Sequence, residues 1–319
     1  MFRSISQCIA IGARLAAVIQ RSDVLGDHMT ANEAARTSTA VSDLSGLDWA
    51  RPLLRVLEER GGISEMAQPE MFEVRVADEL RRTGFAPSYE YAAGVGASTV
   101  DFFVPGQPSF LLEVLSLRVS EGARAANRSN GPFTHFSLSS SNLDDPLRAR
   151  ESIESEVLVA QGKLGDKVWQ SGKPTKFPEP VPGTYHVLVA DVRGLFGGGE
   201  NMASLRPDLK VLTQGFERVD YVEGHPIKIG MGVPGPDGTR AVMGIFEAHP
   251  DHPLRSAQRL RSAVHAVHFV CETAYEPREM LSGAASFVVV NRNLLQREED
   301  FRGFSSCYPL IRPQQSGDH

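Results

Sequence analysis

Two acidic residues interrupt apolar runs of the sequence in a way that points to metal chemistry. Asp101 stands within the run 100–104, and Glu113 stands within the run 110–115. A run that is apolar on both faces is typical of a strand buried inside a sheet. A carboxylate in such a strand costs free energy unless it is protonated, paired with a cation or bound to a metal. The Pro-Gly-Gln-Pro segment between the runs predicts a short turn, so we expect both carboxylates at one end of a hairpin, as oxygen ligands for Mg²⁺.

A third acidic residue, Glu73, lies on a segment with the period of an amphipathic helix. Phe72, Val76 and Leu80 are apolar and four residues apart, which places them on one helical face. Glu73 then has two interpretations. In the first turn of the helix it complements the helix dipole, whereas beside the two strand carboxylates it supports their site.

This order of elements resembles the core of the PD-(D/E)XK nuclease-like superfamily. The matching residues are Glu73 in FEVRVADEL, Asp101 in TVDFF and Glu113 in LLEVLS, and the resemblance covers roughly residues 68–192. It implies a restriction-endonuclease-like core, in which a mixed central sheet is flanked by helices. It also implies hydrolysis of nucleic-acid phosphodiester bonds with Mg²⁺, or Mn²⁺ in its place. By the resemblance, Asp101 and Glu113 hold the metal and Glu73 supports the site.

The sequence departs from that superfamily at the motif lysine. Two residues after the motif glutamate, where the superfamily carries its lysine, this chain has Leu115. Some members carry the lysine on the following helix, and residues 151–171 predict such a helix. Lys163, Lys167 and Gln170 fall at positions i, i+4 and i+7, on one helical face. By the resemblance, Lys167 or Lys163 orients the attacking water or stabilises the phosphorane charge, and Gln170 assists. The alternative is an ordinary solvated helix face.

The leading interpretation is therefore a Mg²⁺-dependent endonuclease that acts on nucleic acid, with DNA in preference to RNA. The alternative is a catalytically inactive copy of the fold that serves as a binding or scaffold module, and Leu115 is its main support. The two interpretations differ in whether Asp101, Glu113 and a lysine amine converge on one place.

The elements around these residues predict an α/β fold. The apolar run 185–192 follows the helix 151–171, so the helix is expected to cross over between two parallel strands. The strand-like runs 264–271 and 285–290 continue the pattern. We expect four parts along the chain: a peripheral or disordered segment 1–45, a nuclease-like core 46–200, a C-terminal α/β extension of the same or a second small domain 201–300, and a tail 301–319.

Composition limits the partners and the compartment. The chain has 319 residues with a net charge of −6, which argues against a protein that coats nucleic acid and leaves room for a local basic groove. Three scattered cysteines suggest a reducing compartment, so we expect a cytoplasmic protein. No apolar run approaches membrane-spanning length, so we expect no membrane partner.

Overall fold

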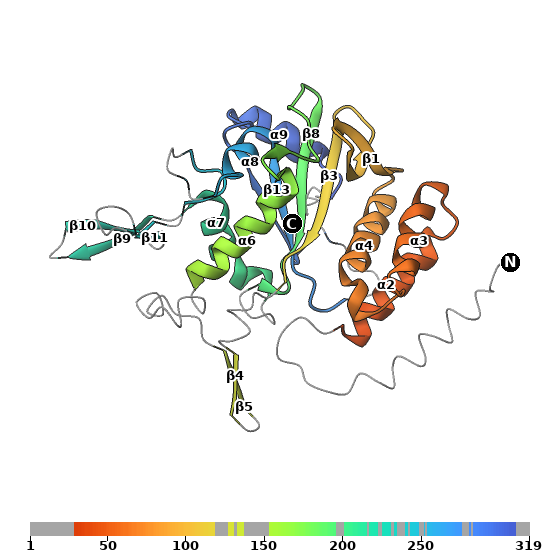
Figure 1. The fold of residues 1–319 in the computed structure, drawn as a ribbon, viewed down its shortest axis with the longest axis horizontal. Coiled ribbons are helices and arrows are strands. Elements are labelled where there is room, and N and C mark those ends of the chain that lie inside the picture. The colour runs from red at the N-terminus through yellow and green to blue at the C-terminus, as the bar shows by residue number, and fades with distance from the viewer. Residues whose placement is uncertain are drawn as a thin grey trace, which may run out of the picture.

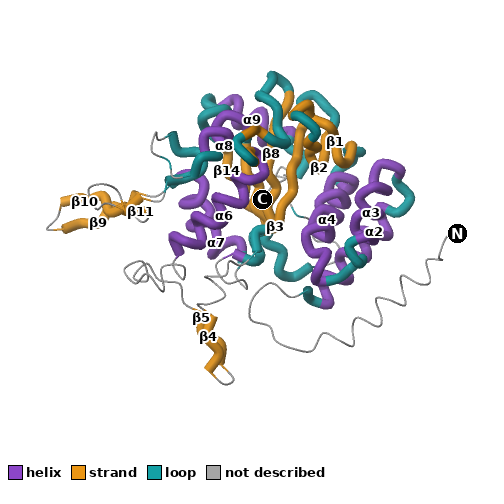
Figure 2. The backbone as a smooth tube through the Cα atoms, in the orientation of Figure 1, coloured by secondary structure: helices purple, strands orange, loops and turns teal. Residues whose placement is uncertain are grey.

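A six-stranded mixed sheet forms the centre of the computed structural model. The structure describes residues 29–118, 127–130, 133–136, 153–195 and 201–215, and residues 217–310 with gaps at 223–224, 231–232, 235–239, 242, 249–251, 253, 276–280 and 282. In space the strands follow the order β1, β2, β3, β8, β13 and β14 (Figures 1 and 2). Their bounds are Ser88–Val95 for β1, Ser98–Val104 for β2, Ser109–Ser116 for β3, Thr184–Asp191 for β8, Ala266–Val270 for β13 and Ser286–Val290 for β14. Strands β3, β8 and β13 run parallel, and the outer neighbours pair antiparallel.

Helices cover both faces of this sheet (Figure 1). One face carries α2 (Ala31–Leu44), α3 (Arg51–Glu59), α4 (Gln68–Arg82) and α9 (Glu298–Cys307). The other face carries α6 (Ile153–Val168), α7 (Met202–Gln214) and α8 (Ala257–Ala263). Each layer buries its own apolar cluster against the sheet.

Short elements complete the described part of the chain. Two 3₁₀ turns are η1 (Asp48–Ala50) and η2 (Glu65–Ala67). The small hairpins pair β4 (Asn127–Asn130) with β5 (Phe133–Phe136), β6 (Trp169–Gln170) with β7 (Lys173–Pro174), β9 (Glu217–Val222) with β10 (His225–Gly230), and β11 (Val233–Pro234) with β12 (Arg240–Ala241).

Apolar sequence explains why β3 and β8 lie at the centre of the sheet. Both strands carry apolar side chains on both faces, so both faces need cover. They pair in parallel, with Leu112 opposite Val187. A parallel pair needs a crossover connection, and α6 supplies it, as the sequence predicted. The predicted α/β class, with a mixed central sheet flanked by helices, is confirmed.

Helix α2 corrects the prediction that residues 1–45 are peripheral or disordered. The helix packs against α4, and the fully buried Arg36 donates from Nη1 to Asp78 of α4 at 2.9 Å. Its serine, threonine and alanine content is typical of mobile segments, but tertiary packing and ion pairs stabilise a helix more than propensity does. Residues 1–28 lie outside the described residues.

The C-terminal part also differs from the expected tail. Tyr308 and Leu310, which follow α9, are buried in the cluster under the sheet. Apolar burial therefore orders the start of the expected tail 301–319, and residues 311–319 lie outside the described residues. Strands β13 and β14, from the expected extension 201–300, belong to the same sheet as the expected core.

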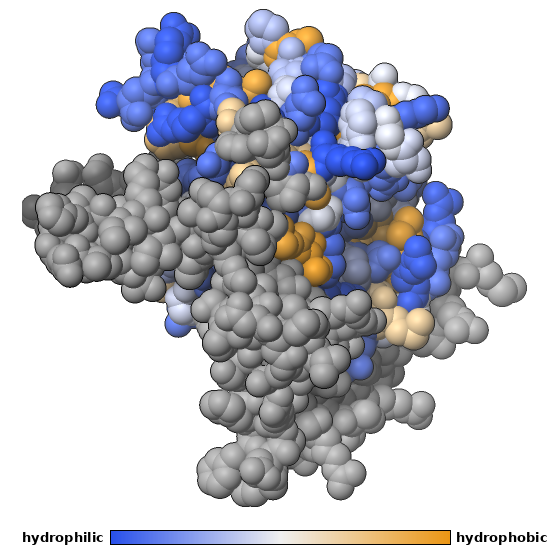
Figure 3. Space-filling view, turned by 60° about the vertical axis from the view of Figure 1, so that its left-hand side comes forward, coloured by the Kyte–Doolittle hydropathy of each residue, from blue (hydrophilic) through white to orange (hydrophobic). Residues whose placement is uncertain are grey.

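The described surface is largely hydrophilic on the face shown in Figure 3, with apolar side chains in small patches. Large apolar side chains that are exposed come from separate segments, namely Met66, Tyr91, Val159 and Val181. Among the described residues, no helix combines the length and the apolar character that crossing a membrane requires.

Candidate functional site

The sheet opens at the two strand carboxylates. Pairing between β2 and β3 ends at Phe102 and Leu112, and the next residues are Asp101 on β2 and Glu113 on β3. Beyond this point Asp101 Oδ2, rather than the β2 backbone, accepts the hydrogen bond of the Val114 amide, at 2.6 Å. The predicted hairpin therefore has both carboxylates where its strands separate.

The acidic side chains act on one another electrostatically. Burial, followed by the negative charge of Glu113, raises the pKa of Asp101 to about 7. Burial also raises the pKa of Glu73 well above its usual range, and the charge of Asp101 adds to that effect. Glu73 Oε2 accepts a hydrogen bond from the Tyr89 hydroxyl of β1 at 3.0 Å. Carboxyl groups that raise one another's pKa need a proton or a cation to lie together.

Lys167 reaches these carboxylates from α6. Its Nζ lies 2.8 Å from Glu113 Oε1 and donates to the Val114 carbonyl at 3.2 Å. Burial lowers the pKa of Lys167, but the charges of Glu113 and Asp101 outweigh burial and raise that pKa above its usual value. Glu113 and Leu115 lie on the same face of β3, because they are two residues apart on a strand. The charged ammonium of Lys167 is therefore fixed on the face where the superfamily's lysine position is occupied by the apolar Leu115.

A second lysine, Lys176, meets the same carboxylate, and sequence reasoning missed it. Its Nζ lies 3.1 Å from Glu113 Oε1. The Glu113 side chain is fully buried, whereas those of Lys167 and Lys176 are 31% and 23% exposed, so solvent reaches both lysines. The sequence signal for Lys176 is weak because it stands in a Pro/Lys-rich loop without periodicity, and only the fold brings that loop to β3.

The dipole interpretation of Glu73 is wrong. Helix α4 begins at Gln68, with Pro69 in the first turn, so the acidic residue of the first turn is Glu70. The favourable interaction with a helix N-terminus fades beyond that turn. Glu73 lies one turn further on, where it interacts with β1 and β2 instead.

Gln170 and Lys163 do not share the position of Lys167. Helix α6 ends before Gln170, which is exposed in the β6–β7 hairpin. Ser171 and Gly172 have φ of 51° and 78°, the geometry of a tight hairpin turn that stops the helix. Lys163 Nζ donates to the Arg118 carbonyl at 2.9 Å, which directs it to the residues that follow β3.

The carboxylates offer a hard cation an oxygen atom that the protein leaves unsatisfied. Glu113 Oε2 is buried without a hydrogen-bond partner, a state that costs free energy and that a bound cation relieves. Across the described ranges, no three His, Cys, Asp or Glu side chains are grouped closely enough to hold a metal ion. Asp101 and Glu113 are the carboxylates that could supply oxygen atoms to an ion here, and such donors suit Mg²⁺ or Mn²⁺ with water completing the shell.

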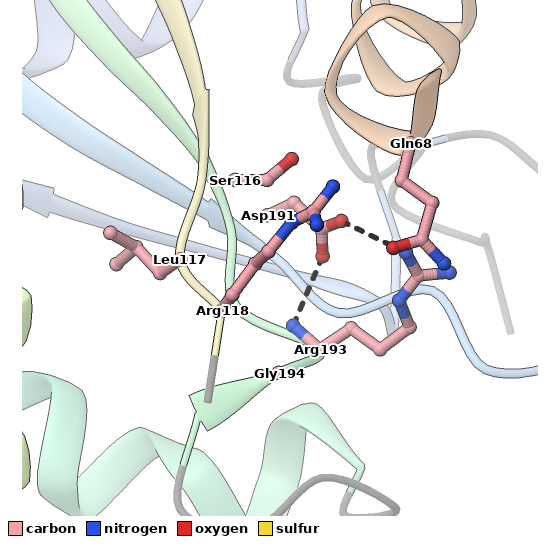
Figure 4. Close-up of a pocket in the computed structure, with 7 residues that line it drawn as sticks. All are labelled: Gln68, Ser116, Leu117, Arg118, Asp191, Arg193 and Gly194. Atoms are coloured by element: carbon pink, nitrogen blue, oxygen red, sulfur yellow. Dashed lines mark hydrogen bonds and ion pairs between the residues drawn. The ribbon is translucent and has the colours of Figure 1, made fainter. Parts of the chain in front are cut away.

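A small cavity lies further along β3 and is distinct from this site (Figure 4). Its volume is about 10 Å³, enough for about one water molecule. Arg193 at the cavity is already paired with Asp191 at 3.5 Å and with Glu33 at 2.6 Å. The cavity is therefore too small to bind a phosphate group, and the charge of Arg193 is already neutralised. Its lining residues are Gln68, Ser116, Leu117, Arg118, Asp191, Arg193 and Gly194.

No family model, no curated protein and no solved structure matches this chain. Arguments about function therefore depend on the geometry of the described residues.

Proposed function

We propose that this protein is a metal-dependent nuclease with a restriction-endonuclease-like core, which hydrolyses phosphodiester bonds of nucleic acid, DNA in preference to RNA. The observation that carries the proposal is the ion pair of 2.8 Å between Lys167 and Glu113. In this pair Lys167 supplies an ammonium from α6, whereas the usual lysine position on β3 is occupied by Leu115. It also lies beside Asp101, whose raised pKa is typical of a functional carboxylate.

Asp101 and Glu113 would hold the metal ion. Bound there, Mg²⁺ or Mn²⁺ supplies a Lewis acid for the phosphate and lowers the pKa of a water molecule. The Val114 amide fixes Asp101, and the two lysines fix Glu113. Both ligands are thus oriented by the chain itself, which lowers the cost of ordering them.

Lys167 and Glu73 have separate roles in this proposal. The raised pKa of Lys167 keeps it charged, so its ammonium can donate hydrogen bonds to negative charge that develops on the phosphate. Glu73 has a pKa raised by burial and by Asp101, so it is held towards its protonated form. Glu73 would support the site from α4, where its Oε2 accepts a hydrogen bond from the Tyr89 hydroxyl.

Cleavage assays on the purified protein test this proposal. Labelled single- and double-stranded DNA and RNA are incubated with Mg²⁺ or Mn²⁺. We expect wild type to cleave, Asp101→Asn to be inactive, and Lys167→Ala to lose turnover by about 10²–10³ while it retains metal binding. Lys163→Ala should lose less, and Gln170→Ala, exposed and outside α6, is the control that should match wild type. Equal turnover in wild type and Lys167→Ala contradicts the proposed role of that lysine.

One observation favours the second candidate, an inactive fold that serves as a binding or scaffold module. Two ammonium groups already neutralise Glu113 Oε1, and the Val114 amide already occupies Asp101 Oδ2. Carboxylates that are paired with ammonium and amide groups in this way can stay buried without a metal cation. If wild type cleaves none of the substrates and neither ion raises its melting temperature, this second function replaces the first.

A further inference from the structure

The loop that carries Lys176 has a backbone conformation that lysine does not favour. Lys176 has φ of 62°, and the Phe177 amide donates across it to the Thr175 carbonyl at 2.7 Å. A three-residue turn of this kind with a positive central φ is rare and strained. Glycine or asparagine suits such a position better. A strained residue is a reason to look for a function of its side chain.

The neighbours of Lys176 hold the strained turn in place. On one side, the Thr175 amide donates to the Val168 carbonyl at 2.9 Å, and Thr175 Oγ1 donates to the Lys167 carbonyl at 3.0 Å. On the other side, Phe177 is fully buried, its ring stacks on His186, and Arg259 donates to its carbonyl at 2.6 Å. The turn is therefore tied to the end of α6, beside Lys167 itself.

The Lys176 amide completes the anchorage. It donates to Ser98 Oγ at the start of β2 at 3.0 Å, so the loop bridges α6 and the strand that carries Asp101. The side chain then reaches Glu113 Oε1, which Lys167 already neutralises at a shorter distance. Lys167 alone is enough to neutralise Glu113, and Lys176 adds a second positive charge that Glu113 shares with the neighbouring Asp101.

From this geometry we propose that Lys176 is a substrate-binding residue, which leaves Glu113 when a divalent cation binds there and contacts a phosphate group of the nucleic acid. The inference rests on the proposed nuclease function. Glu113 attracts the Lys176 ammonium in the metal-free protein. A cation bound at Glu113 would repel that ammonium instead, because like charges within a few ångströms repel. The side chain is 23% exposed, so it has a path towards solvent and substrate, and charge-assisted bonds to phosphate oxygens are strong.

Two binding measurements on Lys176→Gln test the inference, and the expected changes have opposite signs. Removing a competing ammonium should tighten Mn²⁺ binding several-fold in calorimetric titration. Loss of a phosphate contact should weaken binding of a DNA oligonucleotide, measured with Ca²⁺ in place of Mg²⁺, by about tenfold. A residue that only stabilises the fold would instead weaken both, or neither. Lys176→Arg should restore DNA binding, and Lys173→Gln, which changes an exposed lysine of β7 three residues earlier, is the matched control.

A glycine variant separates this role from folding. Lys176→Gly removes the ammonium and suits the positive φ, so it should melt within a few degrees of wild type while DNA binding falls as in Lys176→Gln. If Lys176→Gln and Lys176→Gly both bind DNA as wild type does, the inference is wrong. If wild type nevertheless binds Mn²⁺ and Asp101→Asn does not, the nuclease proposal remains intact. Wild type that binds no Mn²⁺ overturns both.

Discussion

At the scale of single residues, Asp101 and Glu113 are neighbours with different electrostatic surroundings. Glu113 lies within 2.8 Å and 3.1 Å of two ammonium groups. Asp101 is placed by the Val114 amide, and its pKa is raised to about 7 by burial and by Glu113. In metal-free protein two ammonium groups pair with Glu113, whereas burial and the charge of Glu113 favour the protonated form of Asp101.

Asp101 should destabilise the metal-free protein at high pH. Its folded pKa of about 7 exceeds the ordinary aspartate value of about 3.9, so the folded state binds the proton more tightly than the unfolded state. Stability is then lost as pH rises from about 4 to about 7. In urea unfolding with EDTA at pH 8, Asp101→Asn should raise the free energy of unfolding by about 1–3 kcal/mol. The gain should vanish near pH 4, and a gain independent of pH contradicts the raised pKa.

Glu113→Gln should have the opposite effect in the same experiment. Without its charge, the ammonium groups of Lys167 and Lys176 lose their shared partner and repel each other. We expect the free energy of unfolding to fall by about 1–3 kcal/mol. The apolar sequence around Glu113 alone suggests a gain in stability, and only the two lysines reverse that expectation. A stabilised Glu113→Gln protein would mean that the lysines do not pair with it in solution.

At the scale of elements, α6 positions the site by packing closely on α8. A Cβ atom added at Gly165 of α6 would lie 2.9 Å from Ser256 Cβ and 3.4 Å from Leu254 Cδ2. A Cβ added at Gly162, on the same helix, meets nothing within 4 Å. Gly165 therefore permits the close approach of the two elements, whereas Gly162 has no part in it.

Alanine at these two positions should change stability in opposite directions. Gly165→Ala should lower the free energy of unfolding by about 1–3 kcal/mol through overpacking and reduce turnover, because α6 carries Lys167. Gly162→Ala, the matched control, should raise it by about 0.5–1 kcal/mol through helix propensity. Urea unfolding measures both. Equal effects of the two substitutions would show that α6 does not approach Ser256 closely.

The same helix shows how far sequence reasoning reaches at this scale. The apolar runs of β3 and β8 and the period of α6 were sufficient to predict a parallel pair with a crossover helix. The resemblance implied a lysine of this helix at the site, and Lys167 does lie beside Glu113. The helical period failed for Gln170 because α6 ends at Val168, before the Ser171–Gly172 turn. Lys176 could not be predicted, because a strained turn in a loop has no periodic signal.

At the scale of the whole molecule, buried ion pairs join elements that are far apart in sequence. Arg75 of α4 donates to Glu272 at 2.8 Å and to Glu33 of α2 at 3.3 Å, and Glu33 also pairs with Arg193 after β8. Buried charges need such partners. The sequence could not predict them, because the paired residues lie up to 197 positions apart and each segment that carries them resembles ordinary polar surface. Without these partners in view, composition alone led to the expectation that residues 1–45, which include α2, are peripheral or disordered.

The centre of the sheet also buries three histidines in the neutral form. His186 of β8, His265 before β13 and His268 of β13 are almost fully buried, and burial is the main cause that lowers their pKa values to about 4, about 3 and about 3. His268 Nδ1 lies 3.1 Å from the Tyr308 hydroxyl. Below the ordinary histidine pKa of about 6.5, these histidines bind protons in the unfolded chain but stay neutral in the folded protein. Each histidine therefore makes stability fall as pH drops from about 6.5 towards its own folded pKa.

His268→Gln should remove one of these three contributions. The glutamine side chain can still hydrogen-bond the Tyr308 hydroxyl, so the variant should fold, with some loss of stability at pH 7.5. As pH falls from 6.5 to 4.5, wild type should lose more stability than His268→Gln. The difference between their free energies of unfolding should shift in favour of the variant by about 1.4 kcal/mol per pH unit. Carboxyl groups such as Asp101 titrate in both proteins and cancel in that difference. Urea unfolding at half-unit steps of pH measures it. A difference that stays constant over this range would mean that His268 takes up a proton in the folded state as readily as in the unfolded chain.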